Sequence, residues 1–140
     1  ECLQIAKKNP EKIVLGNRCI YDQLAFNEVY EKKGWIDTAI KNKYDEASII
    51  FYPSELREPY AIVLNPGIDV VWEHLHKRWD EEGKKWREDD LEYISLACKS
   101  YENFCNHKNV LYIDNRIDLN SDIDIKKIRD WIYTKSDNLI

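Results

Sequence analysis

The chain of 140 residues contains no methionine and begins with glutamate, so we expect its natural start to lie upstream of Glu1. It also lacks long apolar runs: none approaches the roughly 18 residues of a membrane-spanning helix, and no charged-then-apolar leader opens it. A formal charge of -5 leaves no general excess of positive charge for binding nucleic acid. Neither a membrane nor a nucleic acid is expected as a partner, and the length suits a single domain, residues 1–140.

Cysteine is sparse and lacks the spacing of metal or redox motifs. The chain has four cysteines and no CxxC pair: Cys2, Cys19, Cys98 and Cys105. The last two are seven apart, on one face of a predicted helix where both would be buried. This pattern favours free thiols over a disulfide framework, so we expect a reducing compartment and a cytoplasmic protein. His74 and His76 are only two apart on a predicted helix and cannot ligate one metal together, so no metal site is predicted.

Apolar residues fall into helix-like stripes separated by short continuous runs. The stripes predict helices at residues 3–8, 20–33, 35–45, 66–79, 91–105 and from Ser121 or Asp122 onward. The continuous runs predict strands at residues 12–15, 59–65 and 109–114, whereas residues 48–53 are either a strand or an extended loop. Because the run 59–65 shows no alternation, it is typical of a strand covered on both faces of a parallel sheet.

Strands that alternate with helices predict an α/β fold, with a mostly parallel sheet and helices on both of its faces. Cores of this kind usually begin with a strand and the turn that holds the ligand, whereas this chain opens with a predicted helix. We therefore expect the first strand of the fold to be missing from the sequence.

The best candidate for a functional residue is Arg18, which with Asn17 stands between the predicted strand 12–15 and the helix that follows. Ligands of open α/β sheets bind at the carboxyl ends of the strands, so this arginine is aimed at a crevice, although strand-ending arginines are also common on plain surfaces. Tyr21 and Asp22 follow in the first helical turn. Asp22 suits either substrate contact or capping at the positive end of the helix dipole.

A second cationic region lies between two predicted helices, in the segment 73–87. Its mixed charges are typical of a solvated surface. The alternative is a lid, residues 77–90, in which Arg78 closes over a polyphosphate together with Lys84, Lys85 or Arg87. Arginine suits this task because its planar guanidinium binds phosphate oxygens in pairs and keeps its charge when water is expelled.

The order of these motifs resembles the P-loop deoxynucleoside kinase and thymidylate kinase family over nearly all of the chain. The similar strings are Asn-Arg-Cys-Ile-Tyr-Asp before a helix, Asn-Pro after a strand, Lys-Arg-x-x-Glu-Glu, Asp-Leu-Glu-Tyr and a final strand followed by Asp-Asn. In that family an arginine after the third strand holds the phosphoryl-accepting end of the substrate. Asn17-Arg18-Cys19 matches the family motif at its arginine.

The resemblance implies a three-layer α/β/α fold and ATP-dependent phosphoryl transfer, with Mg²⁺, to a deoxynucleoside or nucleoside monophosphate. It assigns catalysis to Arg18 and Arg78. It also assigns substrate binding to Asn17, Tyr21 and Asp22, and nucleotide binding to Lys77, Arg87 and Arg116. Asn115-Arg116 is otherwise a plain surface turn. Proteins of this family are often dimers, so the resemblance also implies a homodimer as one assembly.

The sequence departs from the family at two places. None of its four glycines begins the phosphate-binding motif G-x-x-x-x-G-K-[ST], so we expect the 140-residue chain alone not to transfer the γ-phosphate of ATP. Asn17 also stands where the family has an acid. One alternative is therefore a noncatalytic nucleotide-binding or protein-assembly module with a degenerate kinase fold, and another is an ATPase-type regulatory domain acting on a different small metabolite.

Overall fold

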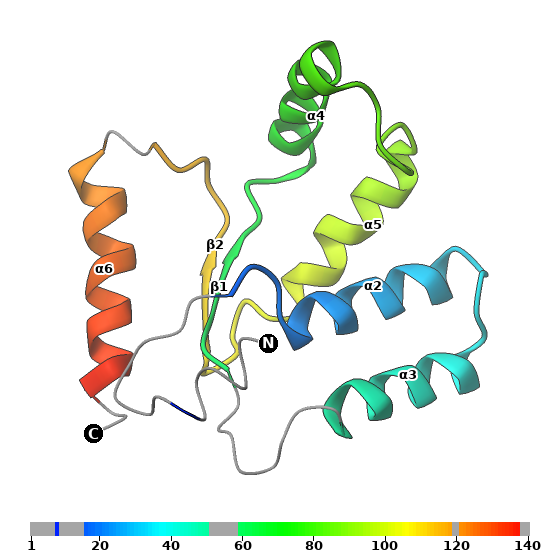
Figure 1. The fold of residues 1–140 in the computed structure, drawn as a ribbon, viewed down its shortest axis with the longest axis horizontal. Coiled ribbons are helices and arrows are strands. Elements are labelled where there is room, and N and C mark those ends of the chain that lie inside the picture. Colours follow the sequence, from blue (N-terminus) through cyan, green and yellow to red (C-terminus); the bar gives the residue numbers. More distant parts are fainter. Residues whose placement is uncertain (1–7, 9–15, 51–58, 119–120, 138–140) are drawn as a thin grey trace.

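The computed structural model describes residues 8, 16–50, 59–118 and 121–137. In this part the chain is a mixed α/β protein (Figure 1). Its elements, in chain order, are α2 (Ile20–Lys32), α3 (Thr38–Ile50), β1 (Ala61–Leu64), α4 (Ile68–Glu82), α5 (Leu91–Glu102), β2 (Val110–Ile113) and α6 (Asp122–Asp137). No helix of this part is both long and apolar enough to cross a membrane.

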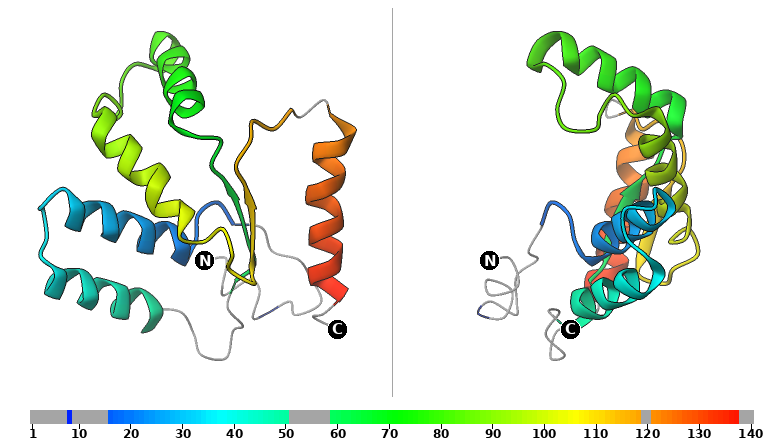
Figure 2. Two further views of the ribbon diagram at one scale, coloured as in Figure 1. Left: turned by 180° about the vertical axis from the view of Figure 1, so that it is seen from behind. Right: turned by 90° about the vertical axis from the view of Figure 1, so that its right-hand side faces the viewer.

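The two strands pair in parallel, with Ala61 opposite Val110 and Leu64 opposite Ile113. The helices α4 and α5 connect them, as a parallel pair requires a crossover. The expected α/β class with a parallel sheet is therefore confirmed. The ribbon views place α2 and α5 on one side of the strands and α6 on the other (Figures 1 and 2).

The helix α2 supplies the centre of the core. Its start is a capping box, in which the Cys19 backbone N–H donates to the Asp22 carboxylate at 2.7 Å. Residues four apart on one face, Tyr21, Ala25 and Val29, are each at most 3% exposed. Tyr21 packs in one cluster with Val63 of β1 and Val110 of β2, and so joins α2 to the sheet.

A buried amide joins α2 to α3. The side chain of Asn27 is fully buried. Its Oδ1 accepts from Gln23 Nε2 at 2.8 Å, and its Nδ2 donates to Asp45 Oδ1 at 2.8 Å. Lys41 pairs with the same carboxylate at 2.5 Å. The position of α3 thus depends on a satisfied polar group inside the helix pair rather than on a buried apolar stripe, since α3 itself has no buried residue.

We expect Asn27→Leu to lower the free energy of unfolding by about 1–3 kcal/mol, because it leaves the Asp45 carboxylate without its buried donor. Urea unfolding followed by circular dichroism measures the change. Lys43→Ala is the control: its exposed side chain lies on α3, the helix that carries Asp45, and we expect a change within about 0.5 kcal/mol. Equal stability of the Asn27 variant and the parent would contradict this assignment.

Several predicted elements differ from the structure. The strand or extended loop predicted at residues 48–53 is wrong for 48–50, because α3 continues to Ile50. Residues 51–53 lie outside the described part. So do the predicted strand 12–15 and, apart from Lys8, the predicted helix 3–8. The predicted helix 35–45 is confirmed as α3, shifted by several residues. The helix predicted from residue 66 begins at Ile68, after the Gly67 cap.

Two predictions about burial are also wrong. The strand β1 is not covered on both faces, since Ile62 is 36% and Leu64 59% exposed while Val63 between them is buried. The helix α5 ends at Glu102, three residues before Cys105. This cysteine is therefore exposed in the following turn rather than buried beside Cys98. Cys19, Cys98 and Cys105 are free thiols.

Candidate functional site

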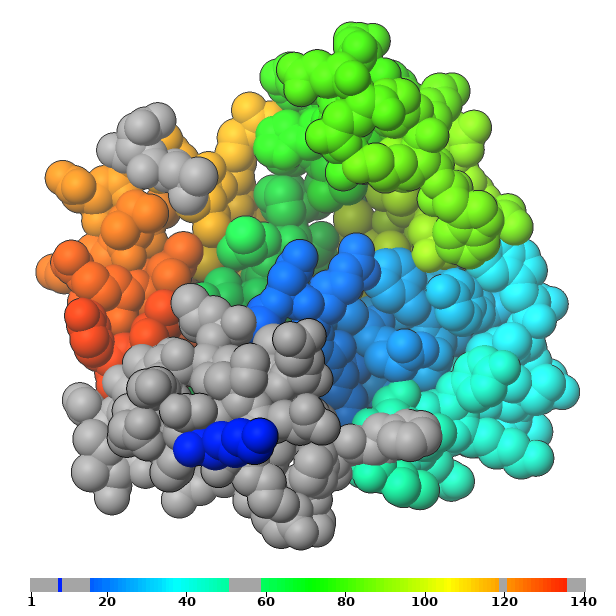
Figure 3. All heavy atoms as spheres, viewed as in Figure 1, coloured from blue at the N-terminus to red at the C-terminus, as the bar shows by residue number. Residues whose placement is uncertain are grey.

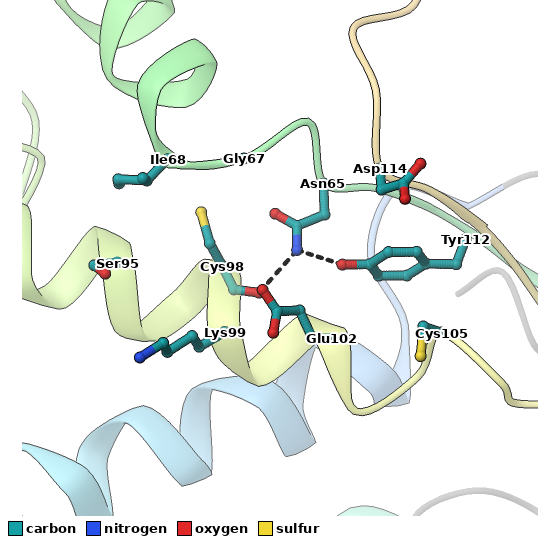
Figure 4. A pocket seen from close by; sticks show the side chains of 10 residues that line it. All are labelled: Asn65, Gly67, Ile68, Ser95, Cys98, Lys99, Glu102, Cys105, Tyr112 and Asp114. Atoms are coloured by element: carbon teal, nitrogen blue, oxygen red, sulfur yellow. Dashed lines mark hydrogen bonds between the residues drawn. The ribbon is translucent and has the colours of Figure 1, made fainter.

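A cavity of about 480 Å³ lies where the two strands end. Asn65 follows β1 and Asp114 follows β2, so both stand at the carboxyl edge of the sheet, the usual ligand position in α/β folds. The cavity is lined by Asn65, Gly67, Ile68, Ser95, Cys98, Lys99, Glu102, Cys105, Tyr112 and Asp114 (Figure 4). In the space-filling view the surface is hollowed in this region, between α4 and α2 (Figure 3).

Asn65 is the fixed point of this cavity. Its side chain is 7% exposed. The amide nitrogen donates to the Cys98 carbonyl at 2.8 Å and to the Tyr112 hydroxyl at 2.6 Å, which uses both of its hydrogens. The amide oxygen has no hydrogen bond within the described residues and points into the cavity (Figure 4). The fold therefore presents a preorganised hydrogen-bond acceptor.

The electrostatic character of the cavity is negative. Burial raises the pKa of the Tyr112 phenol, and the carboxylates of Glu102 and Asp114 raise it further. Burial also raises the pKa of the Cys98 thiol, with a smaller contribution from Glu102, so this cysteine stays protonated at neutral pH. In the described ranges, no group of three or more metal-ligating side chains is placed to hold a metal ion.

A second feature lies on the other side of α5, against α2. Six aromatic side chains, here called the aromatic strip, follow this contact: Phe26, Tyr30, Trp35, Trp86, Tyr93 and Tyr101. Tyr93 is central, with its ring centroid 6.2 Å from that of Phe26 and 5.8 Å from that of Trp35. Trp35 and Trp86 remain 38% and 69% exposed, so this end of the strip offers open ring surface.

Two arginines lie on the aromatic strip, and both have a strained backbone. Arg18 has φ 72° and Arg87 has φ 63°; no other non-glycine residue in the described part has positive φ. The Arg18 guanidinium carbon is 5.7 Å from the Phe26 ring centre. That of Arg87 is 4.3 Å from Trp35 and 5.1 Å from Trp86. Such contacts hold a guanidinium without neutralising its charge.

The charges of these two arginines act on the same phenol. Burial raises the pKa of Tyr93 to about 12, while the positive charges of Arg18 and Arg87 oppose this rise. Neither arginine forms an ion pair or a side-chain hydrogen bond within residues 16–50, 59–118 and 121–137. Two cations without an ion pair in the described residues thus face one run of aromatic rings, with the Asp90 carboxylate as the acid whose pKa the Arg87 charge lowers.

The other residues expected beside Arg18 have mainly structural contacts. Asp22 accepts from the Cys19 N–H and, at 2.6 Å, from the Tyr101 hydroxyl, so both carboxylate oxygens are occupied. Tyr21 is 3% exposed, and its hydroxyl lies 3.4 Å from the Pro59 carbonyl and from His107 Nδ1. The structure therefore places Tyr21 in the core. Asn17 lies exposed in the turn before α2.

Charged side chains of the expected lid, residues 77–90, pair with one another. Arg78 pairs with Glu88, which also accepts from the Trp79 indole at 3.0 Å and from the Lys85 N–H at 3.1 Å. No described contact joins Arg78 to Arg18. It is Arg87, from the same segment, that shares the aromatic strip with Arg18.

The other two cations expected at the nucleotide, Lys77 and Arg116, both form ion pairs with Glu73. Lys77 pairs with Glu73 at 2.6 Å and Arg116 pairs with the same side chain at 2.5 Å. Their hydrogen bonds and charges lower the pKa of Glu73. All three groups are exposed on α4 and the loop after β2, so the pair is weak and leaves both cations able to exchange partners.

We expect the contacts of Glu88 within the lid to weaken in acid, at a pH below the ordinary pKa of a glutamate carboxyl. Burial alone would raise the pKa of Glu88, but hydrogen bonds from Lys85 and Trp79 and the charge of Arg78 lower it overall. A carboxylate with a lowered pKa in the folded state stabilises it above the ordinary value of about 4.3, and loses that contribution as the pH falls through the folded-state pKa. The Trp79 indole N–H resonance should shift over this acid range.

Glu88→Gln should abolish that acid shift, because an amide does not titrate. Glu82→Gln is the matched control, since Glu82 also has a lowered pKa but pairs with Lys85 at 2.5 Å and not with Trp79. An indole resonance that shifts equally in both variants would disprove the role of Glu88.

Sequence reasoning missed the main parts of both features. Asn65 and Asp114 were marked only as polar residues ending apolar strands, and that position is itself the signal that could have identified the cavity. Trp35 and Trp86 are of a type that can stack on a base, but most tryptophans in such sequences serve in packing, so the sequence does not single them out. Their contact with Arg87 depends on its left-handed backbone, which sequence spacing does not reveal.

Comparisons of the chain with models of protein families, with curated proteins and with solved structures found no match.

Proposed function

We propose that this chain is the C-terminal part of a nucleoside or nucleotide kinase, which transfers a phosphoryl group from ATP to a deoxynucleoside or nucleoside monophosphate. The observation that carries the proposal is the pair Arg18 and Arg87 on the aromatic strip. Flat rings bind the faces of a nucleobase, and two guanidiniums that form no ion pair with a described residue can bind phosphate oxygens. An acceptor nucleotide needs both.

The strained backbone of these arginines supports a role in binding. A left-handed conformation costs a non-glycine residue about 1–2 kcal/mol, and such strain is concentrated at ligand sites. Arg18 would hold the acceptor phosphate from the turn before α2, next to Asn17. Arg87 would hold it from the lid. Arg78 would contribute charge to the transition state when the lid exchanges its contact with Glu88 for the ligand.

The finer architecture is part of the same proposal. A single domain with a three-layer α/β/α arrangement would place α2 and α5 over one face of a larger parallel sheet and α6 over the other. Lys77 and Arg116, which share Glu73, would lie on the ATP side. The described residues do not fit a Mg²⁺ site, because the Asp22 carboxylate is occupied by two donors and no acidic cluster accompanies it. No step is therefore assigned to Mg²⁺.

A titration tests the acceptor site directly. The four deoxynucleoside monophosphates and the four deoxynucleosides are added separately to the chain while tryptophan fluorescence is recorded. We expect saturable quenching by at least one of the eight, because Trp35 and Trp86 form the exposed end of the strip. If none of them binds, the proposal is wrong.

A noncatalytic nucleotide-binding module is the second candidate, and one observation favours it. Asp22 is the only carboxylate in the turn that carries Arg18, and both of its oxygens already accept hydrogen bonds. No acid is thereby left to take a proton from an acceptor hydroxyl. Phosphoryl transfer from ATP by the natural full-length protein decides between the candidates: nucleotide binding without transfer identifies the module.

A further inference from the structure

The helix α5 separates two surfaces of opposite chemistry. Its residues Tyr93 and Tyr101 face α2 and the aromatic strip, where the free charges are positive. Its residues Cys98 and Glu102 line the cavity at the strand ends, where hydrogen-bond acceptors dominate (Figure 4). The cavity is therefore not an extension of the proposed acceptor site.

Three acceptors line the cavity: the Asn65 amide oxygen points into it, while the Asp114 carboxylate lies at its edge and points away from Asn65 (Figure 4). The Asn65 residue is 7% exposed, and the two hydrogen bonds of its amide nitrogen fix the position of the amide oxygen. This oxygen accepts no hydrogen bond from a donor in the described part. The carboxylates of Glu102 and Asp114 likewise form no ion pair or hydrogen bond with a described side chain. The Asn65 oxygen opens into the cavity and is not among the fully buried unpaired atoms of the described residues, which are Arg78 Nε and Ser100 Oγ. Its position is fixed before a ligand arrives, which lowers the ordering cost of binding.

We propose that this cavity binds a small organic cation that carries a primary ammonium group. The ammonium supplies three N–H donors and a positive charge, which match the amide oxygen and the two carboxylates. Ile68 and the Cys98 side chain form an apolar wall that suits the carbon chain of an amine. The volume of about 480 Å³ lies within the usual range for small-molecule sites, about 300–1,000 Å³.

The charges that line the cavity disfavour an anionic ligand such as a phosphorylated compound. Glu102 and Asp114 flank the Tyr112 hydroxyl and would repel a phosphate. Lys99 is the one cationic lining residue, and its ammonium end points away from Asn65 (Figure 4). A phosphorylated compound is thus expected on the arginine side of α5 and an amine on this side.

The test is a titration of the isotopically labelled chain with 1,4-diaminobutane, followed by NMR. We expect saturable shifts of the Asn65 side-chain amide signals and of the Ser95 and Cys98 backbone signals, with a dissociation constant that rises with salt concentration. The matched neutral compound is 1,4-butanediol, which has the same chain length and should bind at least tenfold more weakly. Equal binding of diamine and diol, or no saturable shift with either, would overturn the proposal.

Variants then assign the charge to its residues. The exposed pair Glu102→Gln with Asp114→Asn should weaken 1,4-diaminobutane binding at least tenfold without affecting folding, since neither side chain is buried. Glu81→Gln removes one charge from the exposed face of α4, outside the cavity, and should leave binding unchanged. If this control weakens binding as much as the cavity variants, the amine responds to overall charge and not to the cavity. Nucleotide binding to the aromatic strip is measured in a separate titration. A failure of amine binding therefore does not contradict the proposed function, and a failure of nucleotide binding does not contradict the amine site.

Discussion

Replacement of Tyr21 by alanine is expected to lower the free energy of unfolding by about 3–5 kcal/mol, the usual cost of truncating a buried aromatic side chain. The ring is 3% exposed and packs against Val63 and Val110, with the Phe104 centroid 5.1 Å away. Because domains of this size are stable by only about 5–15 kcal/mol, a large share of the stability should be lost. Urea unfolding monitored by circular dichroism measures the change.

Tyr21→Phe is the control for this prediction. It keeps the ring and removes only the hydroxyl, whose contacts include the Pro59 carbonyl and His107 Nδ1, each at 3.4 Å. The expected loss is at most about 1 kcal/mol. If Tyr21→Ala instead kept its stability but lost nucleotide binding, the side chain would face the ligand, as the sequence had predicted, and its place in the core would be wrong.

The second large effect is expected for the double variant Arg18→Gln with Arg87→Gln, which should bind a deoxynucleoside monophosphate at least a hundredfold more weakly. A charge-assisted hydrogen bond contributes about 1.5–3 kcal/mol, and each 1.4 kcal/mol is tenfold in affinity. Each single variant should therefore lose about tenfold. Glutamine retains a planar polar end, so the comparison isolates the charge. Isothermal titration calorimetry measures the dissociation constants.

Arg129→Gln provides the matched control, because it removes one exposed positive charge from α6, far along the chain from the aromatic strip. We expect unchanged affinity. The corresponding deoxynucleoside should bind with similar strength to the parent chain and the double variant, since it lacks the phosphate. Unchanged affinity of the double variant for the monophosphate would remove both arginines from the site.

The order of elements was predictable because apolar spacing reflects local burial. The runs that predicted strands at 59–65 and 109–114 contain β1 and β2, and Asp90 begins α5 as an N-cap that accepts from the Tyr93 N–H at 2.9 Å. The strand or loop predicted at 48–53 was wrong over 48–50, because β-branched Ile49 and Ile50 suggest a strand while the helix simply continues through them. Exposure of Leu64 depends on what lies beside β1, which no local pattern records.

The candidate site was predictable only at single residues. The position of Arg18 after a predicted strand directed attention to the turn before α2. The charged segment 73–87 was expected between two helices, but α4 continues to Glu82, so only its last residues lie between α4 and α5. The partners of these charges were not predictable, because Arg78 forms an ion pair with Glu88 while Arg87 lies over the ring of Trp35. Contacts between side chains distant in sequence depend on the crossing of α2 and α5 and on two unusual backbone angles.

The left-handed backbone at Arg18 and Arg87 lowers the stability of the folded chain, while the arginine side chains are the groups proposed to bind the ligand. Glycine at either position would release about 1–2 kcal/mol of steric cost and would give back about 0.5–1 kcal/mol through the greater freedom of the unfolded chain. Glycine would also remove the contacts of Arg18 with Phe26 and of Arg87 with Trp35, about 0.5–1 kcal/mol each, so the stability of a doubly substituted protein would change little. Stability alone would therefore not favour arginine over glycine at these two positions. An advantage of arginine there would come from what the guanidiniums bind.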